Sequence, residues 1–473
     1  MSTAGADLPT DGADLPAETA DEIAQFVSDW LADDSVPGAT VAVVDADGLR
    51  YVEGFGSRDR ETNAPATART VYGVGSCTKS VTATAVMQQV ERGALALDDP
   101  VADHLDLLGD APGDPVTVHD LLCHGSGLPS DGTLTALLTR LTDRGDGDTD
   151  LPMGGEGDFR RHVEGAAAER LTDEDRFFYY NTGYTLLGRV VEAVADTDYA
   201  TAVREDVLDP LDMDRAGFTE ERFRDHEDRM TPYNYEDGDP VAGSLAFDER
   251  LYAPGGLWAS VPGLATHGRM LLYGGAVDGT RVLDDSSVER MTDQHATRDS
   301  YLDGRDRAYG YGLASEPFLD DELVGHGGMM GTTTAYVGYL AERGVGVAVG
   351  CNAAPGRHPS TVGRAVLAIV AGEDPGETVP ACILERKAEP IEGAYSSHNG
   401  VRNATVERNG GSLSVSFDDP GWSWTAQLFP ESLDPDDRTY YFVNGSGKRV
   451  PVTFDVTDDG ATLLFQRWKL TSE

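Results

Sequence analysis

Two hairpin patterns at opposite ends of residues 39 to 351 constrain the fold of this chain more than any other feature. Ala39 to Val44 and Arg50 to Phe55 are β-rich runs joined by Asp-Ala-Asp-Gly, a strong turn sequence. Thr332 to Leu340 and Gly344 to Cys351 are two further β-rich runs with a short polar break between them. Because helical patterns occur between the hairpins, we expect one α+β domain whose antiparallel sheet takes strands from both ends.

Helices are predicted where apolar residues recur about every 3.6 positions. The segments with this pattern are Ala20 to Leu31, Thr78 to Arg92, Val118 to Cys123 and Tyr184 to Val194. Asp131 to Asp175, in contrast, is rich in Asp, Gly and Arg and has weak periodicity. We therefore expect surface loops over that segment.

The C-terminal region predicts a second, smaller β domain. Gly372 to Pro380 is a polar cluster that is typical of a linker. Short alternating runs separated by Gly- and Asp-rich turns follow at Leu413 to Phe417, Thr425 to Phe429, Thr439 to Val443, Val450 to Phe454 and Thr462 to Trp468. This spacing favours a small antiparallel barrel or sandwich.

These patterns divide the chain into four parts. We expect a disordered acidic tail at residues 1–17, a main domain at 18–375 and a linker at 376–387. A barrel similar to that of the lipocalins is expected at 388–473.

The charge of the chain excludes several classes of partner. Of its 473 residues, 37 are Lys or Arg and 82 are Asp or Glu, which leaves a net charge of -45. Such a surface repels nucleic-acid phosphates and anionic membranes, so neither is expected as a partner. Acidity combined with only four lysines (Lys79, Lys387, Lys448 and Lys469) is typical of a halophilic archaeon, with an acidic mesophilic protein as the alternative.

The sequence contains no clear targeting signal and no clear metal-binding motif. The first 20 residues contain neither a basic region nor an apolar stretch typical of a signal peptide, so a cytoplasmic location is expected. Cys77, Cys123, Cys351 and Cys382 have no paired spacing and are interpreted as core residues. His119, Asp120 and His124 form one short polar cluster without a third spaced ligand, so neither a metal nor a cofactor is expected.

The sequence Ser76-Cys77-Thr78-Lys79 at the start of a predicted helix suggests nucleophilic chemistry. A spacing of three residues puts the hydroxyl and the amine on one helix face. Serine needs a base to remove its proton, and a buried lysine can serve because desolvation lowers its pKa. Lys79 is also the only lysine before Lys387 in a chain that otherwise uses Arg, which cannot lose its proton. A helix-capping serine with a solvated lysine is the alternative.

Three motifs occur in the order and at the approximate distances found in serine β-lactamase-like hydrolases: Ser76-x-x-Lys79, Tyr179-Tyr180-Asn181 and His326-Gly327-Gly328. The chain resembles the class C and CubicO-type branch of this family, whose relatives include D-aminopeptidases and D-Ala-D-Ala carboxypeptidases. Supporting stretches are Asp120 to Pro129, Tyr180 to Gly188 and Pro254 to Trp258. The resemblance covers residues 20 to 375 and implies a β-lactamase/transpeptidase-like fold: an antiparallel sheet flanked by helices, plus a helical subdomain.

The resemblance also implies roles for individual residues. Ser76 is expected as the nucleophile, with Lys79 and Tyr179 in proton transfer. Substrate binding is expected from Asn181, His326 and Gly328, and an oxyanion hole from the backbone N–H groups of Ser76 and Met329. A packed aromatic pair is the alternative interpretation of Tyr179 and Tyr180.

The expected function is that of a serine hydrolase that forms an acyl-enzyme on a small ester, an amide or a short peptide. The related β-lactamases have Lys where this chain has His326, and a neutral histidine holds a carboxylate less firmly. Potent β-lactam hydrolysis is therefore not expected. The alternative is a D-amino-acid peptidase or a weak β-lactamase. A catalytically silent binding protein on the same fold is the non-enzyme alternative, and a homo-oligomer is compatible with the sequence.

The acidic composition predicts that the folded state needs salt, because salt screens repulsion among carboxylates. We expect the melting temperature to rise between 0.1 M and 2 M KCl. Differential scanning calorimetry at several KCl concentrations measures this directly. A melting temperature that is constant or falls over the range would contradict the halophilic interpretation.

Overall fold

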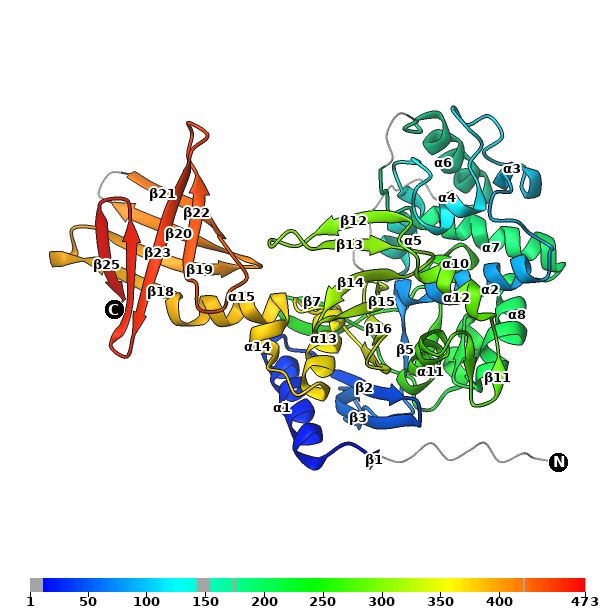
Figure 1. The fold of residues 1–473 in the computed structure, drawn as a ribbon, viewed down its shortest axis with the longest axis horizontal. Helices are drawn as coiled ribbons and strands as arrows, with labels where there is room; N and C mark the ends of the chain where they lie inside the picture. Colours follow the sequence, from blue (N-terminus) through cyan, green and yellow to red (C-terminus); the bar gives the residue numbers. More distant parts are fainter. Residues whose placement is uncertain (1–11, 143–153, 173–175, 420–421, 473) are drawn as a thin grey trace. The chain divides into compact units, whose positions relative to one another are not determined.

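The computed structural model describes residues 12–142, 154–172, 176–419 and 422–472 (Figure 1). Most of the predicted acidic tail therefore lies outside the described residues. The chain divides into two compact units. Unit 1 comprises residues 1–299 and 306–367, and unit 2 comprises residues 300–305 and 368–473.

Unit 1 is built on an antiparallel sheet in which both predicted hairpins meet. The strand order is β1-β3-β2-β17-β16-β15-β14-β13-β12, with β4 paired to β3. Strand β17 (Val345–Cys351) pairs with β2 (Gly38–Asp45), so that Val349 lies opposite Val41. The prediction that one antiparallel sheet takes strands from both ends is thus confirmed, although unit 1 also contains smaller sheets. The other strands of this sheet are β1 (Gly12–Ala13), β3 (Gly48–Asp59), β4 (Ala64–Pro65), β12 (Ala296–Ser300), β13 (Asp306–Tyr309), β14 (Ala314–Phe318), β15 (Asp321–Met329) and β16 (Thr334–Leu340).

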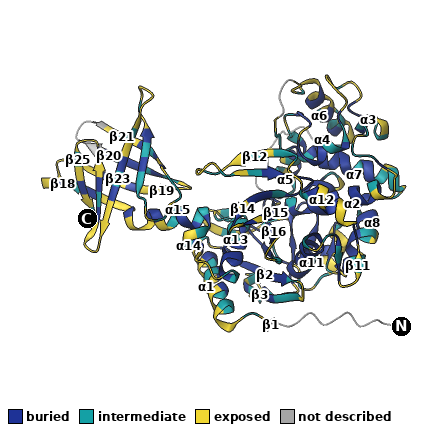
Figure 2. Cartoon of the chain, viewed as in Figure 1, coloured by how far each residue is buried: buried dark blue, intermediate teal, exposed yellow. Residues whose placement is uncertain are grey.

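Helices cover both faces of this sheet. Helix α11 (Val261–Leu272) packs closely on one face, because a Cβ on Gly268 would lie 2.8 Å from the Val337 side chain. Helix α13 (Pro359–Val370) covers the other face, where a Cβ on Gly363 would lie 2.3 Å from the Tyr336 ring. Figure 2 shows buried residues gathered on the strands between these helices.

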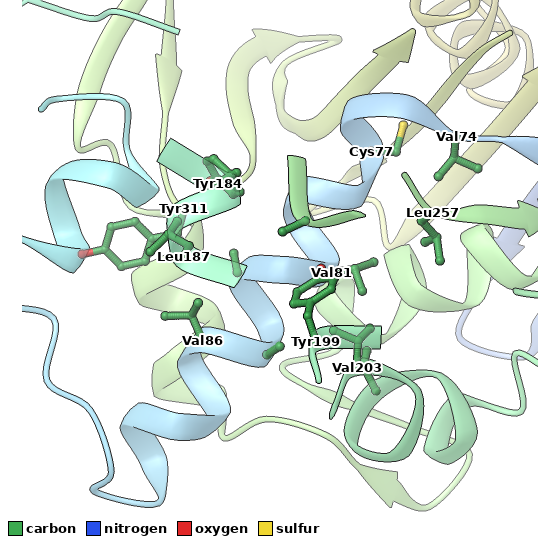
Figure 3. Packing of buried hydrophobic residues seen from close by; sticks show 14 of the residues in the cluster. Val74, Cys77, Val81, Val86, Tyr184, Leu187, Tyr199, Val203, Leu257 and Tyr311 are labelled. Atoms are coloured by element: carbon green, nitrogen blue, oxygen red, sulfur yellow. The ribbon is translucent and has the colours of Figure 1, made fainter. Parts of the chain in front are cut away.

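Helix α2 (Thr78–Glu91) lies at the centre of unit 1, and its residues from Thr78 to Gln89 are all buried. Figure 3 shows Val81 and Val86 of this helix beside Leu187 of α7 (Asn181–Ala195) and Tyr199 of α8 (Tyr199–Val203). The first residue of α2 is therefore held firmly within a packed core. The remaining helices of unit 1 are α1 (Ala17–Asp33), α3 (Val101–His104), α4 (Val118–Leu122), α5 (Gly132–Leu141), α6 (Glu156–Ala168), α9 (Glu220–Asp225), α10 (Glu249–Gly255) and α12 (Asp285–Thr292).

The expectation of loops over Asp131 to Asp175 is wrong where the structure describes that segment. Helices α5 and α6 lie there. Helix α6 buries Phe159 and Val163, and its other positions are mostly charged or small. Its apolar face is therefore too narrow to give a clear 3.6-residue periodicity in the sequence. Residues 143–153 and 173–175 lie outside the described part.

Smaller strands complete unit 1, and three of them form a separate sheet. Strand β9 (Trp258–Ser260) pairs with both β5 (Val71–Gly73) and β6 (Ala216–Gly217). Short hairpins are formed by β7 (Tyr233–Glu236) with β8 (Asp239–Ala242) and by β10 (Ala276–Val277) with β11 (Thr280–Arg281).

Unit 2 contains a closed antiparallel barrel of strands β18 to β25. The predicted run from Thr462 to Trp468 is two strands, because Gln466 adopts a left-handed turn conformation with φ 53. Apolar side chains such as Phe417, Leu463 and Phe465 fill the barrel core. The strands are β18 (Gly393–Ser397), β19 (Asn403–Asn409), β20 (Ser412–Asp419), β21 (Trp422–Pro430), β22 (Thr439–Val443), β23 (Arg449–Thr457), β24 (Gly460–Phe465) and β25 (Trp468–Ser472).

The segment expected as a linker, residues 376–387, is largely helical. It forms α14 (Pro375–Thr378) and α15 (Pro380–Ala388), each with proline at the first helical position. Proline is favourable there because the first N–H groups of a helix have no partner within the helix. Ile383 and Lys387 of α15 are buried, so this part of the chain belongs to a packed unit.

The structure also bears on membrane association. Across the four described ranges, no helix combines the length and the apolar character that crossing a bilayer requires.

Candidate active site

Ser76 lies in a tight turn directly before α2. Gly75 has φ +53, and the turn from Gly75 to Cys77 continues into the helix. The Thr78 hydroxyl donates to the Gly75 carbonyl at 2.7 Å, and the Cys77 thiol donates to the His326 carbonyl at 3.2 Å. The turn is therefore held from the helix on one side and from β15 on the other.

Lys79 is fully buried, and its ammonium has three hydrogen-bond partners. The Nζ atom lies 3.1 Å from Ser76 Oγ, 2.7 Å from Asn181 Oδ1 and 2.7 Å from the Pro254 carbonyl oxygen. Desolvation lowers the pKa of Lys79 to about 7, against an opposing effect of the negative charge on Asp131. The neutral amine is thus well populated near neutral pH, next to the Ser76 hydroxyl.

Asn181 is positioned by the start of α7. The Asp131 carboxylate accepts hydrogen bonds from the Asn181 N–H at 2.8 Å, the Thr182 N–H at 3.2 Å and the Thr182 hydroxyl at 2.7 Å. Asp131 therefore caps the helix from a distant part of the sequence. The cap holds Asn181 where its side-chain oxygen meets Lys79.

Tyr179 lies against both Ser76 and Lys79. Lys79 Nζ lies 4.8 Å from the centre of its ring, and the Ser76 side chain is close enough to act on the pKa of its hydroxyl. Burial raises the pKa of Tyr179. The phenol therefore keeps its proton at neutral pH and can donate that proton in a relay.

His326 on β15 faces the tyrosines. Its Nδ1 lies 2.6 Å from the Gly327 carbonyl oxygen, so that nitrogen carries the hydrogen. Its Nε2 is left to accept from the hydroxyl of Tyr309 at 3.0 Å or of Tyr179 at 3.4 Å. Burial holds the pKa of His326 well below its usual value, and the charges of Lys79 and Arg298 act in the same direction. The imidazole is neutral and serves as an acceptor for the phenols.

Two backbone N–H groups expected in an oxyanion hole are brought together by glycines. A Cβ on Gly75 would lie 2.3 Å from the Met329 nitrogen, and a Cβ on Gly328 would lie 2.7 Å from the Ser76 nitrogen. Both distances are too short for any side chain. Glycine at these two positions is what allows the end of β15 to approach the Ser76 turn.

Comparison with known proteins places this geometry in a family. Residues 23–371 match the beta-lactamase family. The chain belongs to that family. Residues 375–471 match a second family, described as the Pab87 octamerisation domain.

Individual relatives of this beta-lactamase family chain agree with the two matches. The octameric penicillin-binding protein homologue from Pyrococcus abyssi is 31% identical and has a TM-score of 0.88, covering 96% of this chain and 100% of its own. Penicillin-binding protein 4 of Amycolatopsis lactamdurans is 30% identical over 66% of this chain and 79% of its own length. A D-stereospecific amidohydrolase from Streptomyces is 25% identical, with a TM-score of 0.59, over 73% of this chain and 97% of its own.

Tyr309 and Arg298 also lie at the site, although no sequence pattern predicts either of them. Tyr309 donates to His326, and the Arg298 guanidinium lies 5.7 Å from the centre of the Tyr179 ring. Both lie on strands β12 and β13, far along the chain from the Ser76 turn. Their approach depends on sheet order, and neither position carries a motif that could have revealed it.

The His119 and His124 pair does not converge on one point. His124 is buried with its ring centre 4.3 Å from that of Tyr179, and its Nδ1 accepts from the Tyr180 N–H. His119 Nδ1 instead lies 2.7 Å from the Tyr311 hydroxyl oxygen. Among the described residues, no group of three or more His, Cys, Asp or Glu side chains is arranged to hold a metal ion.

The capping role of Asp131 predicts a specific effect of its removal. Asp131→Ala should lower the free energy of unfolding by about 1 kcal/mol, since the α7 cap is lost. It should also slow the reaction of Ser76 with a fluorophosphonate, because Asn181 is no longer held against Lys79. Urea unfolding and the labelling rate measure the two effects.

Asp198→Ala is the matched control, since Asp198 caps α8 through the Thr201 N–H and does not contact the site. It should reduce stability by a similar amount and leave labelling unchanged. Equal labelling rates in the two variants would show that Asp131 does not position the site.

Proposed function

We propose that this protein is a serine hydrolase that works through an acyl-enzyme on Ser76. The observation that supports this most directly is the Lys79 amine, which is fully buried 3.1 Å from the Ser76 hydroxyl. A pKa of about 7 lets this amine accept a proton under ordinary conditions. Membership of the beta-lactamase family is consistent with the proposal.

The first chemical step follows from this arrangement. Neutral Lys79 takes the proton of Ser76 Oγ as the oxygen attacks the carbonyl carbon of the substrate. The negative charge that develops on the carbonyl oxygen is stabilised by the N–H groups of Ser76 and Met329. The partial positive charge at the start of α2 favours the same species.

Collapse of the tetrahedral intermediate requires a proton for the leaving group. Tyr179 keeps its phenolic proton and lies beside Ser76 and Lys79, so we expect it to deliver that proton and recover one from Lys79. His326 and Tyr309 orient the phenol from its other side. Water then attacks the acyl-enzyme by the reverse relay, and no step needs a cofactor.

Small esters and amides are the proposed substrates. His326 is neutral, so it supplies no positive charge to a β-lactam carboxylate, and we expect β-lactam hydrolysis to be weak. D-aminoacyl amides or short peptides are the second candidate, which the 25% identity to a D-stereospecific amidohydrolase favours. A panel of aryl esters, D- and L-aminoacyl anilides and nitrocefin distinguishes these classes.

The substitution Lys79→Arg tests whether Lys79 acts as a base or only as a positive charge. Arginine keeps the positive charge but cannot accept the Ser76 proton, so kcat/KM for an aryl ester should fall by about 10³-fold or more. In the wild type, kcat/KM should rise as pH increases through about 7, because Lys79 loses its proton there. Steady-state kinetics from pH 5 to 9, with circular dichroism to verify folding, measures both.

Lys448→Arg, at an exposed position of the barrel, is the control and should behave as wild type. Ser76→Ala should abolish labelling by a fluorophosphonate. If the wild type itself fails to label, the protein is a silent binding protein. A folded Lys79→Arg variant with more than about a tenth of wild-type activity would remove Lys79 from the mechanism.

We also propose that the barrel of unit 2 joins copies of this chain into a homo-oligomer. The match to an octamerisation domain and the likeness to an octameric homologue support this. Phe429, Val443 and Leu464 are 43%, 57% and 38% exposed on the outside of the barrel. Tyr441 lies opposite both Phe429 and Pro451, and Val443 follows two residues later on the same face of β22. These four residues form the outer patch, in which the Arg449 guanidinium lies 3.8 Å from the centre of the Tyr441 ring. Leu464 lies outside the outer patch, opposite Thr453. A second copy of the chain is the proposed occupant of this outer patch.

Val443→Asp places a charge in the outer patch and should lower the molar mass measured by light scattering on a size-exclusion column. Val401→Asp is the matched control, since Val401 is 63% exposed on the same barrel outside the outer patch. Its mass should equal that of the wild type. A monomeric wild type, or an unchanged mass for Val443→Asp, would exclude the outer patch as an interface.

A further inference from the structure

His358 lies on the opposite face of β15 from the site. Successive residues of a strand point to opposite faces, and His326 points to Tyr179 and Tyr309. Gly327, the next residue, faces His358, since a Cβ there would lie 2.8 Å from His358 Cε1. The imidazole therefore occupies the space that a side chain at position 327 would take.

The hydrogen bonds of His358 determine which ring nitrogen carries the hydrogen. The Ser360 N–H donates to Nδ1 at 3.0 Å, so Nδ1 is an acceptor. The hydrogen is then on Nε2, which lies 3.3 Å from the Gly328 carbonyl oxygen and donates to it. Burial lowers the pKa of His358 to about 4, so this neutral form persists at neutral pH.

The Gly328 carbonyl belongs to the same peptide unit as the Met329 N–H. In a planar trans peptide, the C=O and N–H groups point in opposite directions. The Gly328 carbonyl points towards β16, where Gly328 lies opposite Ala335, and His358 donates to the same carbonyl. The Met329 N–H therefore points away from β16. On that side the Met329 nitrogen approaches the Ser76 turn, where a Cβ on Gly75 would lie 2.3 Å from it.

Strand pairing with β16 holds this peptide unit, and His358 adds a second donor to its carbonyl. Gly327 and Gly328 lie opposite Tyr336 and Ala335, but they have no side chains to restrict φ and ψ. The Met329 side chain is 50% exposed and is not fixed by core packing. The carbonyl of Gly328 is thus the point at which a neighbouring group can fix the orientation of the peptide.

We propose that His358 is a positioning residue that orients the Gly328–Met329 peptide so that the Met329 N–H faces the substrate oxyanion. The inference rests on the proposed acyl-enzyme function, in which that N–H is one of two oxyanion donors. His358 does not touch the substrate and acts only through the peptide. Its effect should therefore fall on the chemical step rather than on substrate binding.

The test compares His358→Leu with His358→Gln. Glutamine can place an amide N–H where Nε2 lies, whereas leucine fills the space without a donor. For an aryl ester we expect His358→Leu to lower kcat by about 10- to 100-fold with KM changed less than threefold, since loss of a whole oxyanion donor costs 10² to 10³. His358→Gln should recover kcat to within about fivefold of wild type. His226→Leu, a half-buried histidine beside Trp258, is the control and should have wild-type kcat.

A crystal structure of His358→Leu supplies a readout that does not depend on activity. We expect the Gly328–Met329 peptide to rotate away from its wild-type orientation, and to keep that orientation in His358→Gln. Equal losses of kcat in the leucine and glutamine variants, or an unrotated peptide in the leucine variant, would overturn the proposal. If wild type is inactive towards all esters and amides, the proposed function fails, while the peptide orientation still decides whether His358 anchors the strand.

Discussion

The burial of one lysine amine is the constraint on which the site depends. Removing an ammonium from water is costly unless it is hydrogen-bonded, and Lys79 meets that requirement with Ser76, Asn181 and the Pro254 carbonyl. Each partner comes from a different part of the chain. The same desolvation that makes the charge costly brings the pKa of Lys79 to about 7. The proton-accepting role that we propose for Lys79 thus depends on the packing around α2.

The close contact between the backbone of β15 and the turn before α2 is the second constraint on the site, and it explains why glycines lie there. The end of β15 and the turn before α2 approach so closely that Gly75 and Gly328 leave no room for a Cβ. The approach brings the Met329 nitrogen next to the Ser76 turn, and it requires a Gly-Gly segment in the strand. Pairing with β16 and the donor from His358 both hold that segment.

Aromatic and imidazole rings form the wall of the site opposite Lys79. Tyr179 and Tyr309 each lie within ring-contact distance of the other and of both His124 and His326. Burial keeps the phenols protonated and the imidazoles neutral. These four side chains therefore add little charge to the site, and the Arg298 guanidinium is a cation next to them, 5.7 Å from the centre of the Tyr179 ring.

The sequence alone was sufficient for the hairpins, for helix α2 and for the motif residues, because each rests on local signals: alternation, 3.6-residue periodicity and short fixed spacings. Family membership followed from those motifs. Tertiary structure decided what has no local signal: that Asp131 caps α7, that Tyr309 and Arg298 reach Tyr179, and that His358 holds the Gly328 carbonyl. These contacts join residues far apart along the chain, and only the order of strands in the sheet and the packing of α2 and α13 bring them together.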